Sequence, residues 1–480
     1  MDRKQLLIGA EWRDAEGGKT LPVINPATEE VIAEIGAASK SDVDATVAAA
    51  RAALTGPWGK LSARERGRLI WRVGEKLVEQ IDQVARLETL HNGKPITESR
   101  HIEIPMAAEC LQYFAGWADK IHGETVPVKG NALVYTTREP LGVVAAIVPW
   151  NFPLLLAIWK VAPALAAGNT VILKPASQTP LTALAFGQIA LDAGLPPGVL
   201  NVITGSGASV GQALVEHPGI NKIAFTGDTS TGRGVMRTAA ETLKHITLEL
   251  GGKSPNIVFP DADLDAAVRG ATVGIFYGKG EVCAAGSRLL VDKSIKDQFI
   301  AKVAERTKKM VPGDPLDPKT RLGAISSKVQ LERVLNYVEI GRKEGASLVA
   351  GGSRADIGTG KGYFMQPTVF ADVKPDMTIA REEIFGPVLA AIEFADVDEA
   401  IARANDSMYG LAAGVWTRDI KKAHYVASRL QAGTVWVNTY NVYDTAASFG
   451  GYKQSGFGRE MGQHALDYYT QLKTVWVDLG

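Results

Sequence analysis

The stretch that decides the fold is Gly142–Gly168, with the sequence GVVAAIVPWNFPLLLAIWKVAPALAAG. It is long and apolar enough to resemble a membrane span, but Pro149, Pro153 and Lys160 interrupt it. Its first part, Val143–Val148, has the pattern of a short buried strand, and a loop and a helix follow. The stretch therefore predicts one strand–loop–helix unit of an α/β protein and argues against a segment that crosses a membrane.

Short apolar runs alternate with helical patterns along much of the chain, which is the signature of βαβ units in a parallel sheet. The first series of predicted strands is Val143–Val148, Thr170–Leu173, Leu200–Ile203 and Lys222–Phe225. Helix-compatible segments lie between them at Ala162–Ala167, Leu181–Ala193 and Ser209–Glu216. A second series follows at Ile257–Phe259, Leu289–Val291, Leu348–Ala350, Leu389–Phe394, Ala413–Trp416 and Val435–Val437. The sequence predicts a doubly wound, Rossmann-type domain and then a second α/β domain.

The two ends of the chain have different patterns. The first ~120 residues are expected to be mainly helical from the spacing and length of their apolar patterns, and these helices would pack around the first domain. The candidate helices are Asp42–Leu54, Ala63–Ile81 and His101–Ile121. Val126–Pro140 and Lys473–Leu479 are extended, and exposed strand edges of this kind often pair with another chain. We therefore assign residues 1–122 and 141–250 to a dinucleotide-binding domain, 251–440 to a catalytic domain, and 123–140 and 465–480 to oligomerisation strands.

Charge and cysteine content exclude several classes of protein. The chain has 52 Lys+Arg and 52 Asp+Glu, so its formal charge of zero suggests neither a nucleic-acid partner nor an anionic membrane. Its two cysteines, Cys110 and Cys283, lie far apart and form no CxxC pair, so we expect no disulfide framework and no metal site. The run Leu6–Ile8 is too short for a signal peptide. A reducing, cytoplasmic location is expected.

Three motifs supply the groups that acyl chemistry requires. Cys283 lies in the small-residue loop GEVCAAGSR, where a ligand can reach a thiol, although a lone cysteine is more often a buried apolar residue. Glu249 follows an apolar strand and precedes two glycines, a position that is also compatible with a solvated carboxylate. Asn151 lies in the loop PWNFP at a strand's carboxyl end, where open α/β sheets bind ligands. Together they offer a nucleophile, a general base and an oxyanion donor.

These motifs, in this order, resemble the aldehyde dehydrogenase superfamily, and the resemblance covers nearly the whole chain. Further matching motifs are Lys174-Pro175-Ala176, Phe225-Thr226-Gly227, Glu383-Ile384-Phe385-Gly386-Pro387 and Phe449-Gly450-Gly451-Tyr452-Lys453. The resemblance implies an aldehyde dehydrogenase-like α/β fold: a Rossmann-type cofactor domain, a second α/β catalytic domain and a small β extension for oligomerisation as a homodimer or homotetramer.

The resemblance also implies the reaction, the NAD(P)-dependent oxidation of an aldehyde to a carboxylic acid. Cys283 would attack the aldehyde, the Asn151 side chain and the Cys283 N–H would hold the oxyanion, and Glu249 would activate water to cleave the thioester. Lys160 and Glu460 match positions thought to relay protons from that base. Glu249 favours the hydrolytic branch over relatives that pass the acyl group to coenzyme A. A thiol-dependent hydrolase that uses no nucleotide would leave Lys174 and Glu383 unexplained. A non-catalytic protein on the same scaffold would leave the thiol and the base unexplained.

Glycine motifs alone do not define the cofactor site. Gly205–Gly211 has Val210 where a GxGxxG fingerprint needs its third glycine, and Gly227–Arg233 lacks the Lys-Ser/Thr of a P-loop. The resemblance implies NAD or NADP as cofactor. It implies as cofactor-binding residues Val148, Pro149, Trp150, Lys174, Pro175, Ala176, Ser177, Gly207, Phe225, Gly227, Asp228, Leu250, Glu383 and Phe385.

The resemblance also implies the substrate site. By the same alignment the aldehyde tunnel is lined by Phe152, Trp159, Tyr443 and Phe449. This aromatic wall suits aliphatic or aromatic aldehydes, although each of the four residues is also compatible with a plain core position.

Three residues depart from the family pattern. Ser177 stands where members that prefer NAD commonly carry Glu, so we expect activity with NADP as well. Asp228 stands where Ser is usual and would place a negative charge beside the pyrophosphate. Glu281 stands where Gln is usual; its carboxylate would raise the pKa of Cys283, unless it points to solvent or pairs with Lys279 or Arg288.

Overall fold

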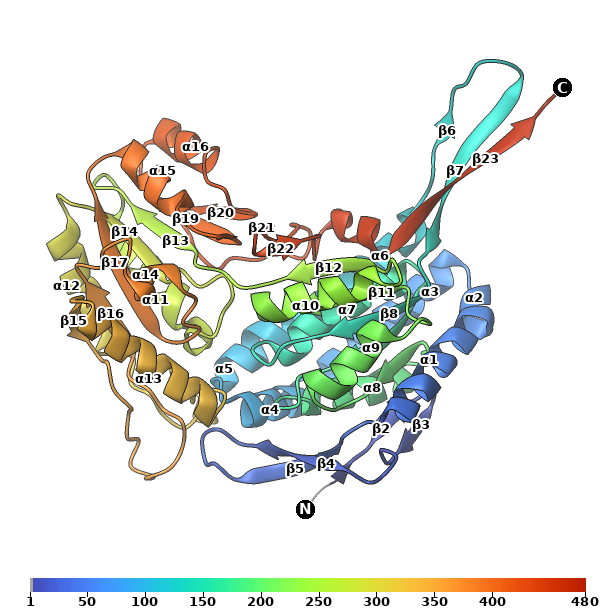
Figure 1. Cartoon of the computed structure of the whole chain (residues 1–480), viewed down its shortest axis with the longest axis horizontal. Helices are drawn as coiled ribbons and strands as arrows, with labels where there is room; N and C mark the ends of the chain where they lie inside the picture. The colour runs from blue at the N-terminus through green and yellow to red at the C-terminus, as the bar shows by residue number, and fades with distance from the viewer. Residues whose placement is uncertain (1–2) are drawn as a thin grey trace.

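The computed structural model describes residues 3–480. Two large sheets lie in separate lobes, and a three-stranded arm projects from the first lobe (Figure 1). This arrangement of elements confirms the expected α/β class.

The first sheet contains the predicted first series of strands. Its strands are β2 (Leu6–Ile8), β3 (Glu11–Arg13), β8 (Val143–Ile147), β9 (Thr170–Lys174), β10 (Leu200–Val202), β11 (Lys222–Thr226), β12 (His245–Glu249) and β22 (Gly456–Phe457). Their order is β22-β12-β11-β8-β9-β10-β2-β3, and β8 to β12 run parallel. The chain builds β8, β9 and β10 in one direction and then returns to place β11 and β12 on the other side of β8. The switch point of the sheet therefore lies between β8 and β11, where open α/β sheets bind ligands.

Helices cover both faces of this sheet because its strands are apolar on both sides. On β8, Val143, Ala145 and Ile147 face one core, and Val144 and Ala146 face the other. The first core includes α1 (Lys40–Thr55), α9 (Gln212–Glu216) and α10 (Thr229–Ala240). The second includes α3 (Ala63–Glu79), α4 (Ile81–Asn92), α6 (Ile104–Trp117), α7 (Pro153–Ala166) and α8 (Leu181–Asp192). Gly142–Gly168 thus forms β8, a loop and α7. Within residues 3–480 no helix has the length and apolar character to cross a bilayer.

The second sheet contains the predicted second series. Its order is β15-β16-β17-β14-β13-β19-β20. The strands are β13 (Pro255–Val258), β14 (Arg288–Asp292), β15 (Ser347–Ala350), β16 (Thr368–Ala371), β17 (Val388–Phe394), β19 (Ala412–Trp416) and β20 (Thr434–Val437), and the main helices are α11 (Leu264–Phe276), α12 (Lys296–Thr307), α13 (Lys328–Lys343), α15 (Val397–Asn405) and α16 (Ile420–Ala427). β16 escaped prediction, and β15 pairs with it antiparallel at the edge.

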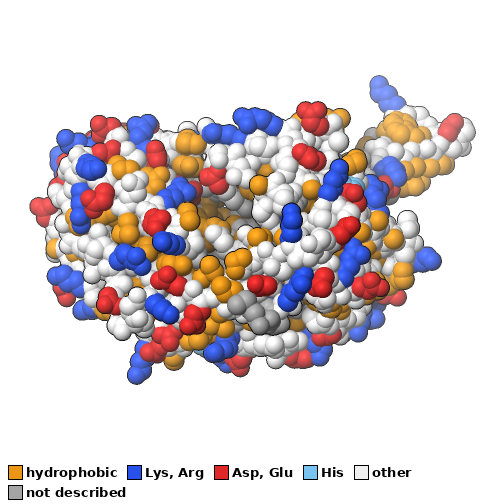
Figure 2. Space-filling view, turned by 60° about the horizontal axis from the view of Figure 1, so that its bottom comes forward, with side chains coloured by type: hydrophobic (Ala, Val, Ile, Leu, Met, Phe, Trp, Pro, Cys, Tyr) orange, Lys and Arg blue, Asp and Glu red, His pale blue; other side chains and the backbone are white. Residues whose placement is uncertain are grey.

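The arm is formed by the two segments predicted to be extended. It contains β6 (Thr125–Val126), β7 (Ala132–Pro140) and β23 (Thr470–Asp478). β23 pairs antiparallel with the whole of β7, from Thr470 opposite Pro140 to Asp478 opposite Ala132. Figure 2 shows the arm as a projection on which hydrophobic side chains gather.

The N-terminal region needs a correction. The expectation of a mainly helical region misses five strands in residues 3–36, which include β1 (Arg3–Lys4), β4 (Thr20–Ile24) and β5 (Val31–Gly36). β2 joins the first sheet beside β10, and β1 pairs with β5. The predicted helix Ala63–Ile81 ends at Glu79, and a π-helical turn, η1 (Ser99–Glu103), precedes α6 in the region predicted as the helix His101–Ile121.

Candidate active site

Cys283 lies in the loop between the 3₁₀ turn η4 (Tyr277–Gly280) and β14, as its small-residue motif predicts. Its side chain is half-buried and lines two cavities, one of about 160 Å³ and one of about 150 Å³. Leu156 is the other residue that the two cavities share. The thiol therefore lies where two separate binding spaces meet.

The larger cavity is aromatic. All four predicted substrate residues line it: Phe152, Trp159, Tyr443 and Phe449. The ring centroids of Trp159 and Phe449 are 5.6 Å apart, and those of Tyr443 and Phe449 are 5.7 Å apart. Sequence reasoning missed further members of this wall: Ile102, Met106, Leu155, Val273, Tyr277, Val282 and Asn441. Ile102 and Met106 come from η1 and α6, whose apolar pattern predicts only helix packing.

The second cavity is a cleft at the switch point of the first sheet. Seven predicted cofactor residues line it: Pro149, Trp150, Gly227, Asp228, Leu250, Glu383 and Phe385. They come from the carboxyl ends of β8, β11 and β12 and from the loop before β17. Gln330 and Arg333 of α13 also line the cleft and escaped prediction; they hold its wall by donating to the backbone oxygens of Phe385 at 2.6 Å and of Glu383 at 3.1 Å.

The remaining predicted cofactor residues lie outside the wall of this cleft: Val148, Lys174, Pro175, Ala176, Ser177, Gly207 and Phe225. Most belong to adjacent strand ends, and the Val148 N–H donates to the Lys174 backbone oxygen at 3.1 Å. Burial lowers the pKa of the Lys174 ammonium to about 8. Gly207 begins the π-helical turn η3 (Gly207–Gly211). These residues therefore lie at neighbouring strand ends and in η3, outside the cleft that Cys283 lines.

Asn151 is buried, and its amide nitrogen Nδ2 donates to the backbone oxygen of Glu281 at 2.9 Å. Asn151 and Cys283 both line the cleft. Because a side-chain amide carries two N–H donors, one can keep the loop bond while the other serves an oxyanion at the thiol.

Glu249 ends β12, and its carboxylate is buried. Among the described residues 3–480, none donates a hydrogen bond to either of its side-chain oxygens. Burial and the nearby Glu460 carboxylate raise the pKa of Glu249 well above its usual value, although Lys160 and Arg459 act against the rise. A Cβ at Gly450 would lie 2.9 Å from Oε1 of Glu249, so that glycine leaves room for the carboxylate.

Lys160 and Glu460 form a buried ion pair beside the Glu249 carboxylate. The Lys160 ammonium also donates to the hydroxyl of Thr226 at 2.6 Å. Thr226 lies opposite Glu249 in the β11–β12 register. The structure therefore brings Glu249, Lys160 and Glu460, which come from three distant parts of the sequence, into one buried charged group.

Comparison with known proteins agrees with this geometry. A sequence model described as the aldehyde dehydrogenase family matches residues 12–475. The chain belongs to the aldehyde dehydrogenase family. Human mitochondrial aldehyde dehydrogenase is 48% identical over 476 residues, which cover 98% of this chain and 92% of that protein.

Solved structures of the family superpose closely on the chain. The aldehyde dehydrogenase of Bacillus cereus in its NAD+ complex has a TM-score of 0.98 and 48% identity, and the match covers 100% of this chain and 97% of that one. An indole-3-acetaldehyde dehydrogenase complexed with NAD+ has a TM-score of 0.98, 45% identity and the same coverage. The family resemblance, the fold and the class of enzyme, an oxidoreductase, expected from the sequence are confirmed.

The thiol of this family member is held in its neutral form. Burial raises the pKa of Cys283 to about 12, and the carboxylates of Glu383 and Glu249 add to the rise. Glu383 accepts the backbone N–H of Gly252 at 2.9 Å, and burial raises the pKa of this carboxyl to about 7. Both carboxylates thus oppose formation of a thiolate.

Two of the three departures from the family pattern have a clear structural role. Asp228 caps α10 by accepting the backbone N–H groups of Ser230 at 2.8 Å and Thr231 at 3.1 Å. Partial burial raises the pKa of Asp228, but the hydrogen bonds from Ser230 and Thr231 outweigh it, so the carboxylate stays ionised at the helix N-terminus. Glu281 is fully buried and lies 2.9 Å from the Lys279 ammonium, which favours the ion-pair interpretation over a direct effect on the thiol.

Proposed function

We propose that the protein oxidises aliphatic or aromatic aldehydes to carboxylic acids with NAD or NADP, through a thioester on Cys283. The observation that carries the proposal is the position of this thiol, which lines an aromatic cavity on one side and the switch-point cleft on the other. One space suits an apolar aldehyde, and the other lies where parallel sheets bind nucleotides.

The cleft fits a nicotinamide dinucleotide. It combines the N-terminal end of α10, the carboxylate of Glu383 and the flat ring of Phe385, and the buried Lys174 ammonium lies on the next strand end. We assign cofactor binding to the predicted set of residues: Val148, Pro149, Trp150, Lys174, Pro175, Ala176, Ser177, Gly207, Phe225, Gly227, Asp228, Leu250, Glu383 and Phe385. Bound there, NAD or NADP supplies the hydride acceptor of the oxidation.

Five side chains carry out the other steps of the reaction. Glu249 takes the proton of the Cys283 thiol as Sγ forms a bond to the carbonyl carbon, and the resulting oxyanion receives hydrogen bonds from Asn151 Nδ2 and the Cys283 N–H. After oxidation, Glu249 takes a proton from water as the water oxygen attacks the thioester, and the C–S bond breaks to release the acid and the thiol. Lys160 and Glu460 pass the proton on from Glu249.

Steady-state turnover with a panel of aldehydes, measured by absorbance of the reduced cofactor, tests this proposal. We expect Cys283→Ala to abolish turnover, and Glu249→Gln to accumulate acyl-enzyme after one round of reduction. Cys110→Ala is the matched control, because Cys110 is a buried thiol within α6 and should leave turnover unchanged. Retained turnover in Cys283→Ala would exclude the thioester route.

Ser177 leads us to propose that both cofactors are used. It is half-buried in the turn after β9, where a carboxylate would repel the 2′-phosphate of NADP. Turnover with NADP below one-hundredth of that with NAD, on the order of 2.7 kcal/mol, would contradict this assignment.

We further propose that the chain acts in the cytoplasm as a homodimer or homotetramer that forms through the arm. Leu472 is 61% exposed and Trp476 64% exposed on β23, an edge strand, and such apolar edges pair with other chains. Trp476→Glu should shift the light-scattering mass to that of a monomer. An unchanged mass would place the interface elsewhere.

A further inference from the structure

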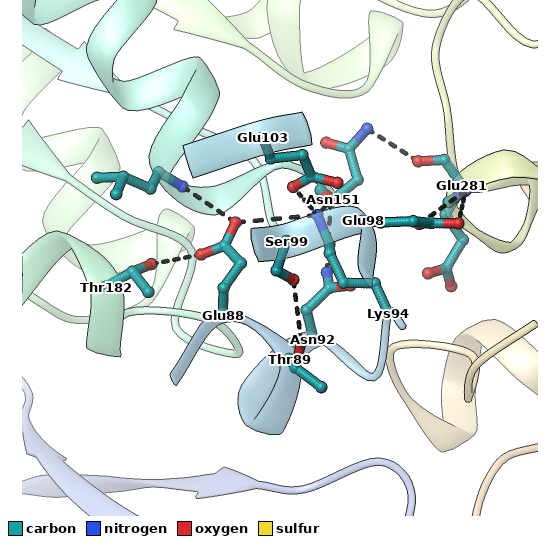
Figure 3. Close-up of polar contacts among 12 residues, drawn as sticks. Glu88, Thr89, Asn92, Lys94, Glu98, Ser99, Glu103, Asn151, Thr182 and Glu281 are labelled. Atoms are coloured by element: carbon teal, nitrogen blue, oxygen red, sulfur yellow. Dashed lines mark hydrogen bonds and ion pairs between the residues drawn. The ribbon is translucent and has the colours of Figure 1, made fainter. Parts of the chain in front are cut away.

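A buried network of ionisable side chains contacts the loops that carry Asn151 and Cys283, and Figure 3 shows the part of it around Glu88, Lys94 and Glu103. Its members are Glu88, His91, Lys94, Glu98, Glu103, Lys279 and Glu281, and all of them are buried. They come from α4, the segment through α5 (Ile96–Glu98) and η1, and the turn η4 with the loop that follows it to Cys283. The proposed chemistry assigns no role to any of these side chains.

One part of the network holds the loop of Asn151. The Lys94 ammonium donates to the backbone oxygen of Asn151 at 2.9 Å and forms an ion pair with Glu103. The side-chain amide of Asn92 donates to the backbone oxygen of Trp150 at 2.7 Å. Asn92, the last residue of α4, and Lys94, two residues later, thus fix the backbone that carries the oxyanion donor.

A second part holds the loop of Cys283. The Lys279 ammonium donates to the backbone oxygen of Asn92 at 2.9 Å and to its side-chain oxygen at 2.7 Å. It also lies 2.9 Å from Glu281, whose other oxygen accepts the backbone N–H of Ser326 at 3.0 Å. Lys279 has φ of 64°, a left-handed conformation that lysine rarely adopts, so the surrounding contacts must hold it there.

These contacts close a ring around the reacting groups. Lys279 binds Asn92, Asn92 binds the backbone before Asn151, and the Asn151 amide binds the Glu281 backbone oxygen, two residues before the thiol. We propose that Lys279, paired with Glu281, is a positioning residue that sets the Asn151 amide relative to Cys283. This inference rests on the proposed function, because it assigns the amide to the oxyanion.

The charges make the ring sensitive to single substitutions. Lys279→Gln leaves the Glu281 carboxylate buried without its cation, and breaking a buried pair on one side is far more harmful than replacing both partners. Glu281→Gln should disturb the ring less than Lys279→Gln does, because Gln can still accept the Ser326 N–H and Lys279 keeps its bonds to Asn92. The double variant Lys279→Gln/Glu281→Gln leaves neither charge and is expected to fold and to restore the geometry in part.

Kinetics of these variants test the proposal. We expect Lys279→Gln to lower kcat by up to about 10²-fold, the loss that follows a displacement of reacting groups by roughly 1 Å, with KM for the aldehyde changed much less. The double variant should recover at least about tenfold of that loss. Lys244→Gln is the control, because Lys244 is another buried lysine whose ammonium contacts Thr242, away from both loops. Equal kcat values for Lys279→Gln, the double variant and the parent enzyme would overturn the proposal.

A second cycle separates positioning from a general structural effect. If Lys279 acts through Asn151, Lys279→Gln should lower kcat little further in an Asn151→Ala background. Multiplicative losses there would overturn the proposal, and so would a failure of the double variant to recover kcat. Failure of the proposed function is a different result: Cys283→Ala would then keep turnover, whatever the Lys279 variants do.

Discussion

The protonation of Cys283 gives a quantitative prediction for the enzyme without cofactor. Burial raises the pKa of this thiol from 9.0 to about 12, and Glu383 and Glu249 add to the rise. Because only the thiolate attacks an alkylating agent, the rate of alkylation by iodoacetamide should follow the thiolate fraction. The rate should therefore rise about tenfold for each pH unit from 7 to 10, without a plateau.

The size of the effect follows from the pKa. A pKa of about 12 in place of 9.0 lowers the thiolate fraction near pH 8 by about 10³-fold relative to an ordinary cysteine. A thiolate of higher pKa is a stronger nucleophile. With a Brønsted coefficient of about 0.4–0.5, its rate constant is roughly 15- to 30-fold higher, which offsets part of the lower thiolate fraction. Cys283 should react about 30- to 60-fold more slowly than an unperturbed thiol.

Alkylation is best measured in a Cys110→Ala background, so that Cys283 is the single thiol. Glu383→Gln should speed the reaction above pH 7, because the carboxyl of Glu383 has a pKa of about 7 and opposes the thiolate once ionised. Glu382→Gln is the matched control, since the Glu382 carboxylate is exposed and accepts the Tyr337 hydroxyl at 2.7 Å. A plateau below pH 9 in the parent, or an equal acceleration in both Glu variants, would refute this account of the thiol.

Three further predictions concern stability, cofactor and substrate. Burial raises the pKa of Glu98 from 4.5 to about 8, so the folded state keeps a proton that the unfolded chain releases, and stability should fall between these pH values by on the order of 5 kcal/mol. Glu98→Gln should remove that fall in the free energy of unfolding, measured by denaturant titration at each pH. Parallel pH profiles of the variant and the parent enzyme would contradict this prediction. Asp228→Ser should tighten cofactor binding by up to about fivefold in calorimetry, by removing a like charge from the cleft; an unchanged Kd would exclude repulsion. Trp159→Ala should enlarge the aromatic cavity and shift kcat/KM by about tenfold or more toward bulky aldehydes, and an unchanged preference would place the substrate elsewhere.

The sequence predicted best the features that short local signals define. Asn151, Glu249 and Cys283 each lie at a strand end or in a loop marked by glycine or proline, so their motifs indicate both the residue and its place in a parallel sheet. The roles assigned to them stay predictions until the variants are measured, as do the domain boundaries.

The sequence predicted least the features that depend on distant pairings. Glu88, Lys94 and Glu103 are charged residues, which proteins rarely bury without a partner, so the sequence alone places them at the surface. Only the packing of α4 and η1 against the Asn151 loop buries them. The strands of residues 3–36 were not predicted for a similar reason, because β2 pairs with β10, almost two hundred residues further along the chain. Gln330 and Arg333 join the cleft only because α13 folds against the loop of Glu383.

The position of Cys283 between two cavities has a consequence for inhibitor design. A compound that fills only the aromatic cavity would block aldehydes without displacing the nucleotide, and its potency would not fall as cellular nucleotide levels rise. Selectivity over relatives would then depend on Ile102 and Met106 in the cavity wall, residues that the family motifs do not specify. A weakly reactive warhead would be a poor choice for such a compound, because the resting thiol is protonated.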